Sequence, residues 1–284
     1  MMVHFNKVNK KIEKFMLKDI SFDLPKGYIL GIVGENGAGK TSLINILLGL
    51  YKNYDGEVLI DGMDYKKQEW DIKNEIGFVL VDDLFDKDLS LIQNGDQYGK
   101  YYENYERNKF LQYCEEFGLD YSKKLKKMSK GEKLKFQFAF ALSHNPKLLV
   151  LDEPTANFDP MFQKKFREII TGFVSDGQHS VILATHLTTD LDQIADYVFF
   201  MNKGKMVFYW DKETMNEKYR MVSGEDYKIN LLKKEKIVFK EKGQYSSKAL
   251  VRHHRWNEYS ELEVRIPTIE EIMYYVVKGG YHHV

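Results

Sequence analysis

A glycine-rich segment of eight residues is the part of this chain whose residue types and spacing most clearly predict chemistry. Residues 34–41 read Gly-Glu-Asn-Gly-Ala-Gly-Lys-Thr, which has the spacing G-x-x-x-x-G-K-[ST]. Glycines let the backbone curl so that successive N–H groups point inward, where they can bind phosphate oxygens. The lysine could reach the terminal phosphates, and the threonine hydroxyl could ligate Mg²⁺. The motif predicts binding of a nucleoside triphosphate with Mg²⁺ by Gly34, Asn36, Gly37, Ala38, Gly39, Lys40, Thr41 and Ser42.

The residues on either side of this phosphate loop support the same interpretation. The apolar run 28–33 precedes it and can form a buried strand, and the run 42–50 has the composition of a helix. The N-terminus of that helix would add positive potential at the phosphates. A glycine-rich turn without a ligand is the alternative, which this strand-to-helix setting disfavours.

Polar residues also follow two other apolar strand patterns. Asp152 and Glu153 come directly after the run 148–151, and His186 follows the run 180–184. Ligands of parallel α/β sheets bind at the carboxyl ends of the strands, so we expect these side chains beside the phosphates. Asp152 would then hold Mg²⁺ through a water molecule, Glu153 would polarise the attacking water, and His186 would contact a phosphate. The alternatives are a strand that ends at an acidic turn and a solvated histidine.

Ser129 and Glu132 have the spacing of a capping box, which predicts a helix that begins near them and ends at about Ser143. A helix capped at Ser129 would present free N–H groups and its positive dipole end to an anion. A simple helix start is the alternative, and the two interpretations are compatible.

The rest of the chain predicts the elements that position these residues. With 284 residues, 43% of them hydrophobic, it can bury a full core as one domain of about 200 residues with an appendage. Strand patterns alternate with helical ones, which favours a parallel α/β sheet. Residues 85–127 are charged and rich in tyrosine at helical spacing, which we interpret as helix packing. We therefore predict a nucleotide-binding domain at residues 1–210, with a helical subdomain at about 85–145, and an appendage at 211–284.

Charge and cysteine content disfavour some classes of function. Lys plus Arg and Asp plus Glu both number 42, so the charge balance does not indicate nucleic acid as the main partner. The single cysteine, Cys114, excludes an internal disulfide and fits a reducing cytosol. We find no apolar stretch long enough to span a bilayer, and residues 1–14 lack the apolar core of a signal peptide. Any role at a membrane is expected to act through a partner.

The order and spacing of these motifs, over about residues 8–209, resemble those of the ATPase subunit of ABC transporters. The resemblance rests on the phosphate loop, the segment Ser129-Lys130-Gly131, the Asp152-Glu153 strand end, Asp159 and His186. It implies an α/β P-loop NTPase fold with a parallel sheet core, an antiparallel β subdomain and a helical subdomain. It also implies a homodimer or heterodimer of ATPase subunits, with each ATP between one phosphate loop and the other subunit's Ser129-Lys130-Gly131 segment.

The resemblance also implies roles for single residues. Glu153 resembles the catalytic carboxylate, His186 the histidine that contacts the γ-phosphate, and Asp159 the aspartate that communicates between the two sites of the dimer. Catalysis, with Lys40 on the phosphates, would rest on positioning and charge stabilisation.

At the helix start the chain departs from the commonest family pattern. Lys130 and Glu132 stand where Gly and Gln are more usual, whereas Ser129 and Gly131 are kept. Because the kept residues make the close phosphate contacts in this family, ATP sensing is expected to remain.

Two further departures concern Mg²⁺ and the base. The Gln that usually follows residues 76–78 is replaced by Val81, which leaves Asp82 as the candidate for that contact with Mg²⁺. No tyrosine lies near Lys11 to stack on adenine. Phe15 is the nearest candidate, and a core role for Phe15 is the alternative.

Other details resemble Gram-positive exporter ATPases of the ABC-2 type, such as those for phenol-soluble modulins or antimicrobial peptides. They are the Ser-Lys-Gly form at 129–131, the run 143–147 and the segment 267–272. This implies a peripheral protein at the cytoplasmic face of the membrane that drives separate transmembrane permease subunits. The alternative is a soluble ABC ATPase that acts on ribosomes or DNA, but the two domains or coiled-coil insertion of such proteins are not evident. Lys40, Asp152, Glu153 and His186 together disfavour an inactive regulatory subunit.

The appendage is predicted to be folded. Residues 236–240 and 261–266 alternate at the strand period, and Thr268 can cap a helix with Glu271 three residues on. An apolar stripe on that helix would pack on the appendage's own strands or on a second subunit, and is formed by Ile269, Ile272, Met273 and Val276.

Overall fold

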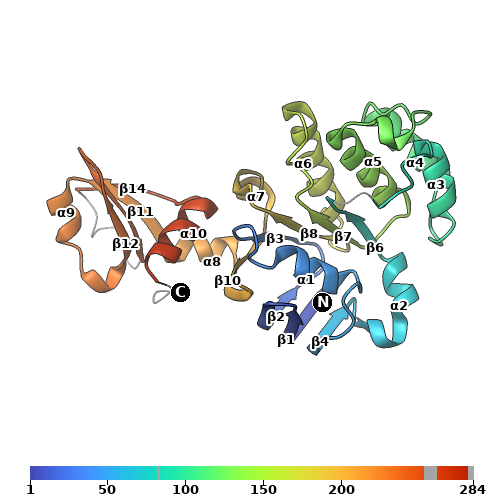
Figure 1. Cartoon of the computed structure of the whole chain (residues 1–284). Helices are drawn as coiled ribbons and strands as arrows, with labels where there is room; N and C mark the ends of the chain where they lie inside the picture. Colours follow the sequence, from blue (N-terminus) through green and yellow to red (C-terminus); the bar gives the residue numbers. More distant parts are fainter. Residues whose placement is uncertain (82–83, 253–260, 281–284) are drawn as a thin grey trace.

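The computed structural model describes residues 1–81, 84–252 and 261–280 (Figure 1). The strands are β1 (Val3–Ile12), β2 (Phe15–Leu24), β3 (Ile29–Val33), β4 (Asp55–Ile60), β5 (Met63–Asp64), β6 (Ile76–Val79), β7 (Leu148–Asp152), β8 (Ser180–Thr185), β9 (Tyr197–Asn202), β10 (Lys205–Asp211), β11 (Tyr219–Gly224), β12 (Ile237–Lys242), β13 (Ser247–Arg252) and β14 (Glu263–Arg265). The helices are α1 (Lys40–Leu47), α2 (Tyr65–Asn74), α3 (Leu91–Gly99), α4 (Arg107–Glu116), α5 (Lys130–Ser143), α6 (Pro160–Val174), α7 (Thr188–Ile194), α8 (Lys212–Lys218), α9 (Asp226–Asn230) and α10 (Ile269–Lys278), with 3₁₀ turns η1 (Leu125–Lys127) and η2 (Lys234–Lys236).

A buried parallel sheet forms the centre of the larger part of the molecule. Strand β3 pairs in parallel with β8 and β9, and β7 pairs in parallel with β8 and β6. Alternate residues of β3 enter two hydrophobic cores: Ile29 and Val33 pack with α5, α6 and α7, whereas Leu30 and Ile32 pack with α1. Burial on both faces explains why the middle residues of these strands are apolar. The predicted α/β fold with a parallel sheet core is confirmed.

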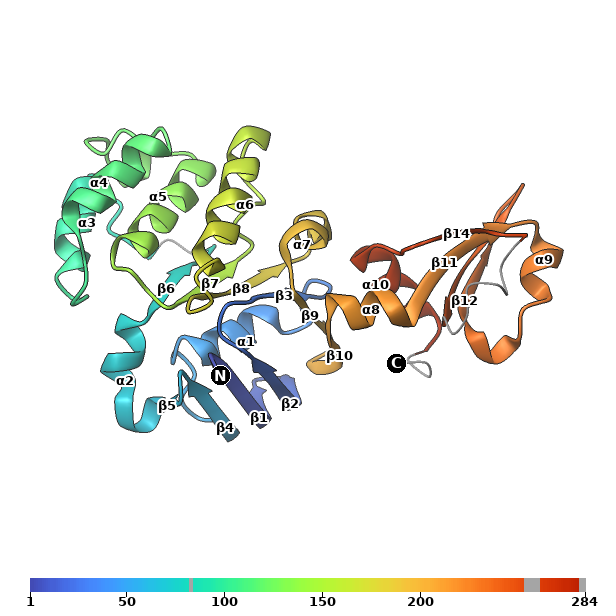
Figure 2. The same cartoon turned by 180° about the vertical axis from the view of Figure 1, so that it is seen from behind.

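An antiparallel subdomain and a helical subdomain flank this core. Strands β5, β4, β1 and β2 extend the same sheet on one side, to give the order β5-β4-β1-β2-β10-β9-β3-β8-β7-β6. Helices α3, α4 and α5 pack together at the other side (Figures 1 and 2). Tyr98, Tyr102 and Tyr105 are partly buried against the core there, as the packing interpretation predicts, whereas 57% of Tyr101 is exposed.

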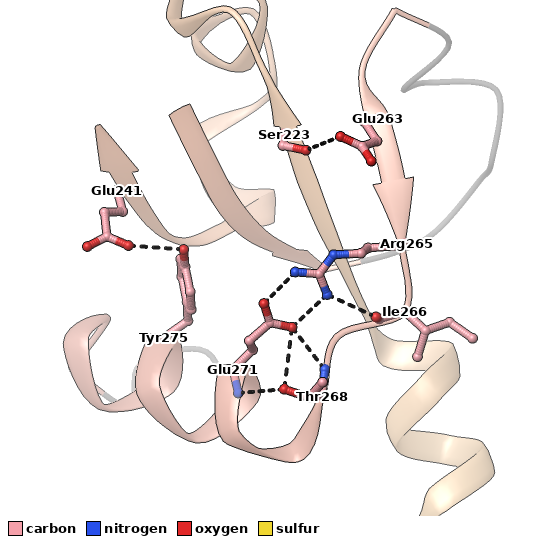
Figure 3. Close-up of polar contacts among 8 residues, drawn as sticks. All are labelled: Ser223, Glu241, Glu263, Arg265, Ile266, Thr268, Glu271 and Tyr275. Carbon is pink, nitrogen blue, oxygen red and sulfur yellow. Dashed lines mark hydrogen bonds and ion pairs between the residues drawn. The ribbon is translucent and has the colours of Figure 1, made fainter. Parts of the chain in front are cut away.

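The C-terminal residues form a second, antiparallel sheet with the strand order β12-β13-β11-β14. Figures 1 and 2 show it at the end of the molecule opposite to α3 and α4, with α10 lying between it and α7. Thr268 caps α10 in a capping box with Glu271, and Arg265 reinforces it by pairing with the same carboxylate (Figure 3).

The apolar stripe of α10 packs within this chain. Ile269, Ile272 and Val276 are fully buried, and Met273 is partly buried against the same core. The helix contacts β12, β13 and α7, and the backbone N–H of Ile269 donates to the Asp192 carboxylate at 3.0 Å. Of the two packing partners that the sequence left open, the structure has the appendage's own strands, together with α7. Among the described helices, none combines the length and the apolar character that crossing a bilayer requires.

Candidate nucleotide site

The phosphate loop joins β3 to α1, and its backbone requires glycine. Gly37 and Gly39 have φ angles of 80° and 112°, which side chains rarely allow. A Cβ at position 39 would also lie 2.8 Å from the Leu17 side chain and 2.9 Å from the Phe15 ring. Helix α1 begins directly after Gly39, so its first N–H groups face the loop, where they can bind an anion.

Lys40 lies over this loop, and only 7% of its surface is exposed. Its ammonium donates to the Gly34 carbonyl at 2.8 Å and lies 3.7 Å from Oε1 of Glu153. A cation held in this place by the loop itself is oriented to meet the charge of bound phosphates.

Thr41 and Asp152 meet at the same edge of the sheet. The Thr41 hydroxyl donates to Oδ2 of Asp152 at 2.9 Å, and Asp152 is buried at the end of β7. Hydroxyl and carboxylate oxygens are ligands that Mg²⁺ prefers, and Mg²⁺ in nucleotide sites usually takes one or two protein ligands besides phosphates and water. This oxygen pair therefore fits the ion.

Glu153 adopts a left-handed backbone conformation, with φ of 48°. Such a conformation in a residue other than glycine costs free energy and persists only where the surroundings fix it, often at functional sites. The Glu153 N–H donates to the Ala184 carbonyl at 2.8 Å, and its carboxylate accepts from the Thr185 hydroxyl at 3.0 Å and the His186 N–H at 3.0 Å. The His186 ring completes this cluster, with Nδ1 2.9 Å from Oε2 of Glu153.

A cleft of about 790 Å³ runs along the phosphate loop. Phe15 lines it, as do Lys40, Thr41, Asp152 and Glu153. Val81 also lines the cleft and is 65% exposed, whereas Asp82 lies outside the described residues. The cleft thus brings together the phosphate loop, the acidic strand end and the aromatic candidate for base stacking.

The remaining site candidates lie elsewhere on the surface. Ser129, Lys130 and Asp159 are exposed, and Gly131 at the start of α5 is partly buried. None of the four is among the residues that line the cleft. Ser129 accepts from the Glu132 N–H at 3.1 Å, while the Glu132 carboxylate accepts from the Ser129 N–H at 2.7 Å. This is the predicted capping box, and it leaves the helix start facing outward.

Sequence reasoning missed two side chains that contact these residues. The Thr185 hydroxyl donates to the Glu153 carboxylate, and its signal was a hydroxyl residue between the apolar run 181–184 and His186. Lys135 lies 3.0 Å from Asp159, and nothing in its local sequence distinguished it from the other lysines of α5.

Comparisons with known proteins agree with this geometry. Residues 17–156 match the family described as ABC transporter. YdbJ of Bacillus subtilis strain 168, an uncharacterized ABC transporter ATP-binding protein, is 32% identical over 207 residues, which cover 72% of this chain and 67% of that protein. The lantibiotic transport ATP-binding protein SrtF of Streptococcus pyogenes is 28% identical over 197 residues, 69% of this chain and 84% of that protein.

A solved structure gives the same fold. The dimeric ATP-binding cassette MJ0796, bound to ADP and Pi, matches with a TM-score of 0.66 and 22% identity, over 74% of this chain and 98% of that one.

Proposed function

Because this chain belongs to the ABC transporter ATP-binding family and is an ATPase, we propose that it dimerises on ATP and drives export through separate transmembrane subunits. The observation that carries the proposal is the cluster of Lys40, Thr41, Asp152, Glu153 and His186 at one edge of the parallel sheet.

The phosphates of ATP bind to the N–H groups of the phosphate loop and to Lys40. Gly34, Asn36, Gly37, Ala38, Gly39 and Ser42 complete this cradle. Thr41 and Asp152 hold Mg²⁺, which would offset the negative charge of the phosphates when bound. Asp82 stays a candidate for a further contact with the ion, and Phe15 for stacking on the base.

Glu153 accepts a proton from the water that attacks the γ-phosphorus, and His186 contacts the γ-phosphate beside it. The 2.9 Å separation of the two side chains supports this division of roles, since both can reach one small volume at the strand ends. Positioning and charge stabilisation supply most of the rate in phosphoryl transfer, and the fixed backbone of Glu153 suits that requirement.

The second half of the site comes from a partner subunit. Ser129 and Lys130 are exposed at the start of α5, Gly131 beside them is partly buried, and none of the three lines the cleft of its own chain, so this helix start is available to another subunit's nucleotide. The N-terminus of α5 offers N–H groups to the γ-phosphate of the ATP bound by that other subunit. Asp159 lies on the same outward surface and takes part in communication between the two sites.

Export of a peptide is the transport reaction that we favour, because the lantibiotic transport protein of S. pyogenes is similar to this chain over most of its length. Phenol-soluble modulins and antimicrobial peptides are the proposed cargo classes. The protein would then lie peripherally at the cytoplasmic face of the membrane, as a homodimer or a heterodimer.

Purification of the chain from membranes tests this function. An affinity-tagged copy carrying Glu153→Gln, which should stall the complex with ATP, is expected to retain a polytopic membrane protein. Recovery of ribosomes or DNA in its place would support the soluble alternative and contradict transport.

A further inference from the structure

One lysine joins the start of α5 to the loop that precedes α6. Lys135 lies one turn into α5, and its ammonium is 3.0 Å from Oδ2 of Asp159. The same ammonium lies 4.1 Å from the centre of the Phe162 ring on α6. Only 16% of the Lys135 side chain is exposed, so both contacts are made by a largely desolvated cation.

The loop and the helix also touch through their backbones. A Cβ at Gly131 would lie 2.4 Å from the Asn157 carbonyl oxygen, so the loop packs directly against the helix axis at a position that only glycine allows. Phe158 is buried and meets the Phe162 ring edge to face at 4.6 Å. The loop is thus fixed to α5 at Gly131 and at Lys135, one turn apart.

Asp159 has two separate tasks in this arrangement. Its Oδ1 accepts from the Phe162 N–H at 2.9 Å, which caps α6, while its Oδ2 binds Lys135. Both contacts hold the pKa of Asp159 below its usual value, with the backbone hydrogen bond the larger cause. The cap does not need the lysine, so loss of Lys135 should remove one of the two ties between the loop and α5 while α6 keeps its start.

An isolated ion pair with an exposed carboxylate contributes little to stability. Lys135 differs because burial and the Phe162 ring strengthen its contacts. Lys135 should therefore affect the position of the loop before α6 more than the free energy of unfolding.

The loop connects directly to the proposed catalytic carboxylate. Four residues separate Glu153 from Phe158, and the Phe158 N–H donates back to the Thr155 carbonyl at 3.1 Å, which makes the segment a short, fixed turn. Ser129 lies at the other end of the same assembly, as the cap of α5.

We infer that Lys135 is a positioning residue that makes Glu153, the Asp159 loop and the Ser129 helix start of one subunit move as a single unit. The inference rests on the proposed function, since Ser129 matters only if it serves a partner's nucleotide. Through Lys135, a change at the nucleotide site of one subunit, at Glu153, would shift the Ser129 helix start that the same subunit presents to its partner.

Lys135→Met and Lys135→Arg separate this role from stability. Methionine keeps the length and apolar stem of lysine without the charge, and arginine keeps both contacts. Lys165→Met is the matched control, because Lys165 also pairs with a carboxylate, Glu116 at 3.2 Å, and lies 5.7 Å from an aromatic ring, Phe117, away from the loop. Each variant is made alone and together with Glu153→Gln.

Two readouts are compared. In the Glu153→Gln background with ATP, the protein concentration at which half of the subunits are dimeric should rise at least about threefold for Lys135→Met, because the Ser129 helix start is no longer held in position before the subunits meet. In the protein that keeps Glu153, Lys135→Met should lower kcat about tenfold, while the affinity of the monomer for a fluorescent ATP analogue stays constant. Lys135→Arg should restore both, and Lys165→Met should change neither.

The outcomes distinguish this inference from the proposed function. If Glu153→Gln alone forms no dimer with ATP, the proposed function fails and the inference fails with it. If Glu153→Gln dimerises, and Lys135→Met matches Lys165→Met in dimer midpoint and kcat, only the role of Lys135 is overturned.

Discussion

Nδ1 of His186 lies 2.9 Å from Oε2 of Glu153, and the two residues follow neighbouring parallel strands. The pairing of Asp152 with Ala184 sets the register of β7 and β8, so that both strands end at the same level. Lys40 approaches the same carboxylate from the phosphate loop at 3.7 Å. Two segments far from Glu153 in the sequence, the phosphate loop and the end of β8, therefore converge on its side chain, which makes Glu153 the first target for mutation.

Glu153→Gln should leave ATP affinity within a few-fold of wild type and lower kcat by about 10²–10⁴, the usual contribution of a positioned base. Glutamine keeps the side-chain size and one acceptor oxygen for Thr185 or the His186 N–H, whereas it cannot take the proton of water. Equilibrium binding of a fluorescent ATP analogue and steady-state phosphate release measure the two quantities. Hydrolysis by this variant at near the wild-type rate would refute the assignment of the base.

Phe15→Ala should weaken ATP binding by about 1–3 kcal/mol if the ring stacks on the base, as other aromatic residues do. Stacking tolerates any base, so we also expect only a modest preference for ATP over GTP in a competition assay. The Phe15 ring also packs beside Gly39, and a thermal unfolding scan of the variant shows whether the loop is disturbed. A preference for ATP of several hundredfold, on the scale of hydrogen-bonded readout, would show that another group recognises the base.

His144 should make the free energy of unfolding depend on pH. Its ring is buried, stacks on Tyr102 at 4.1 Å and lies 3.2 Å from the Ile76 carbonyl. Burial lowers the pKa of His144 from 6.5 to about 4. Between those values the unfolded chain binds a proton that the folded chain does not, so stability falls as pH drops from 6.5 to 4.

The expected loss from this residue is about 3 kcal/mol over the full interval. Urea unfolding of the wild type and of His144→Gln at pH 7 and at pH 5 measures about 2 kcal/mol of this loss, because that range covers only part of the interval. The variant should be less stable at pH 7 but lose less on acidification. Equal losses in the two proteins would show that His144 is not held neutral.

Truncation after Tyr209 should keep nucleotide binding but alter dimer stability or coupling to the membrane partner. The appendage shares its core with α7. The Asp192 carboxylate accepts a hydrogen bond from the Ile269 N–H at the start of α10, and burial raises the pKa of Asp192. Asp192→Ala in the full chain should therefore lower the free energy of unfolding by about 1–3 kcal/mol, while Asp192→Asn, which keeps an acceptor oxygen, should cost less. A truncated protein that hydrolysed ATP and supported transport like the full chain would rule out such a role for the appendage.

The strand-end chemistry could be predicted because it follows from local patterns. An apolar run fixes where a buried parallel strand ends, and sheet geometry then brings Asp152, Glu153 and His186 to one edge. The left-handed backbone of Glu153 and the contact between Lys135 and Asp159 could not be predicted. Both depend on packing between segments that are distant in sequence or on neighbouring strands.

Elements without a clear period were also missed. Strand β1 has shifts in its pairing with β2 between Phe5 and Val8 and between Val8 and Lys10, which break the alternation of apolar and polar residues. Strand β11 lies between β13 and β14 and is buried over Tyr219, Arg220, Met221 and Val222, so it shows no alternation either. Helix α8 is only seven residues long, too short for a helical period to be recognised.

The central claim is that each nucleotide is bound between two subunits. Ser129 caps a helix on the outside of the chain, while Lys40 lies in the cleft, so one chain cannot apply both to the same phosphate. Ser129→Arg should abolish turnover without weakening ATP binding to the monomer, and Lys40→Ala should lose binding. A mixed dimer of the two variants has one complete site and one site with both defects.

The most direct measurement is therefore ATP hydrolysis by an equimolar mixture of the Ser129→Arg and Lys40→Ala proteins, compared with each protein alone. If subunits exchange freely, half of the dimers are mixed, and turnover should recover to as much as about a quarter of the wild-type value, given two equivalent sites per symmetric dimer. The rate should also rise more steeply than the first power of protein concentration. No recovery in a mixture whose subunits demonstrably exchange, or Ser129→Arg turnover that equals wild type and stays first order in protein, would contradict the shared site.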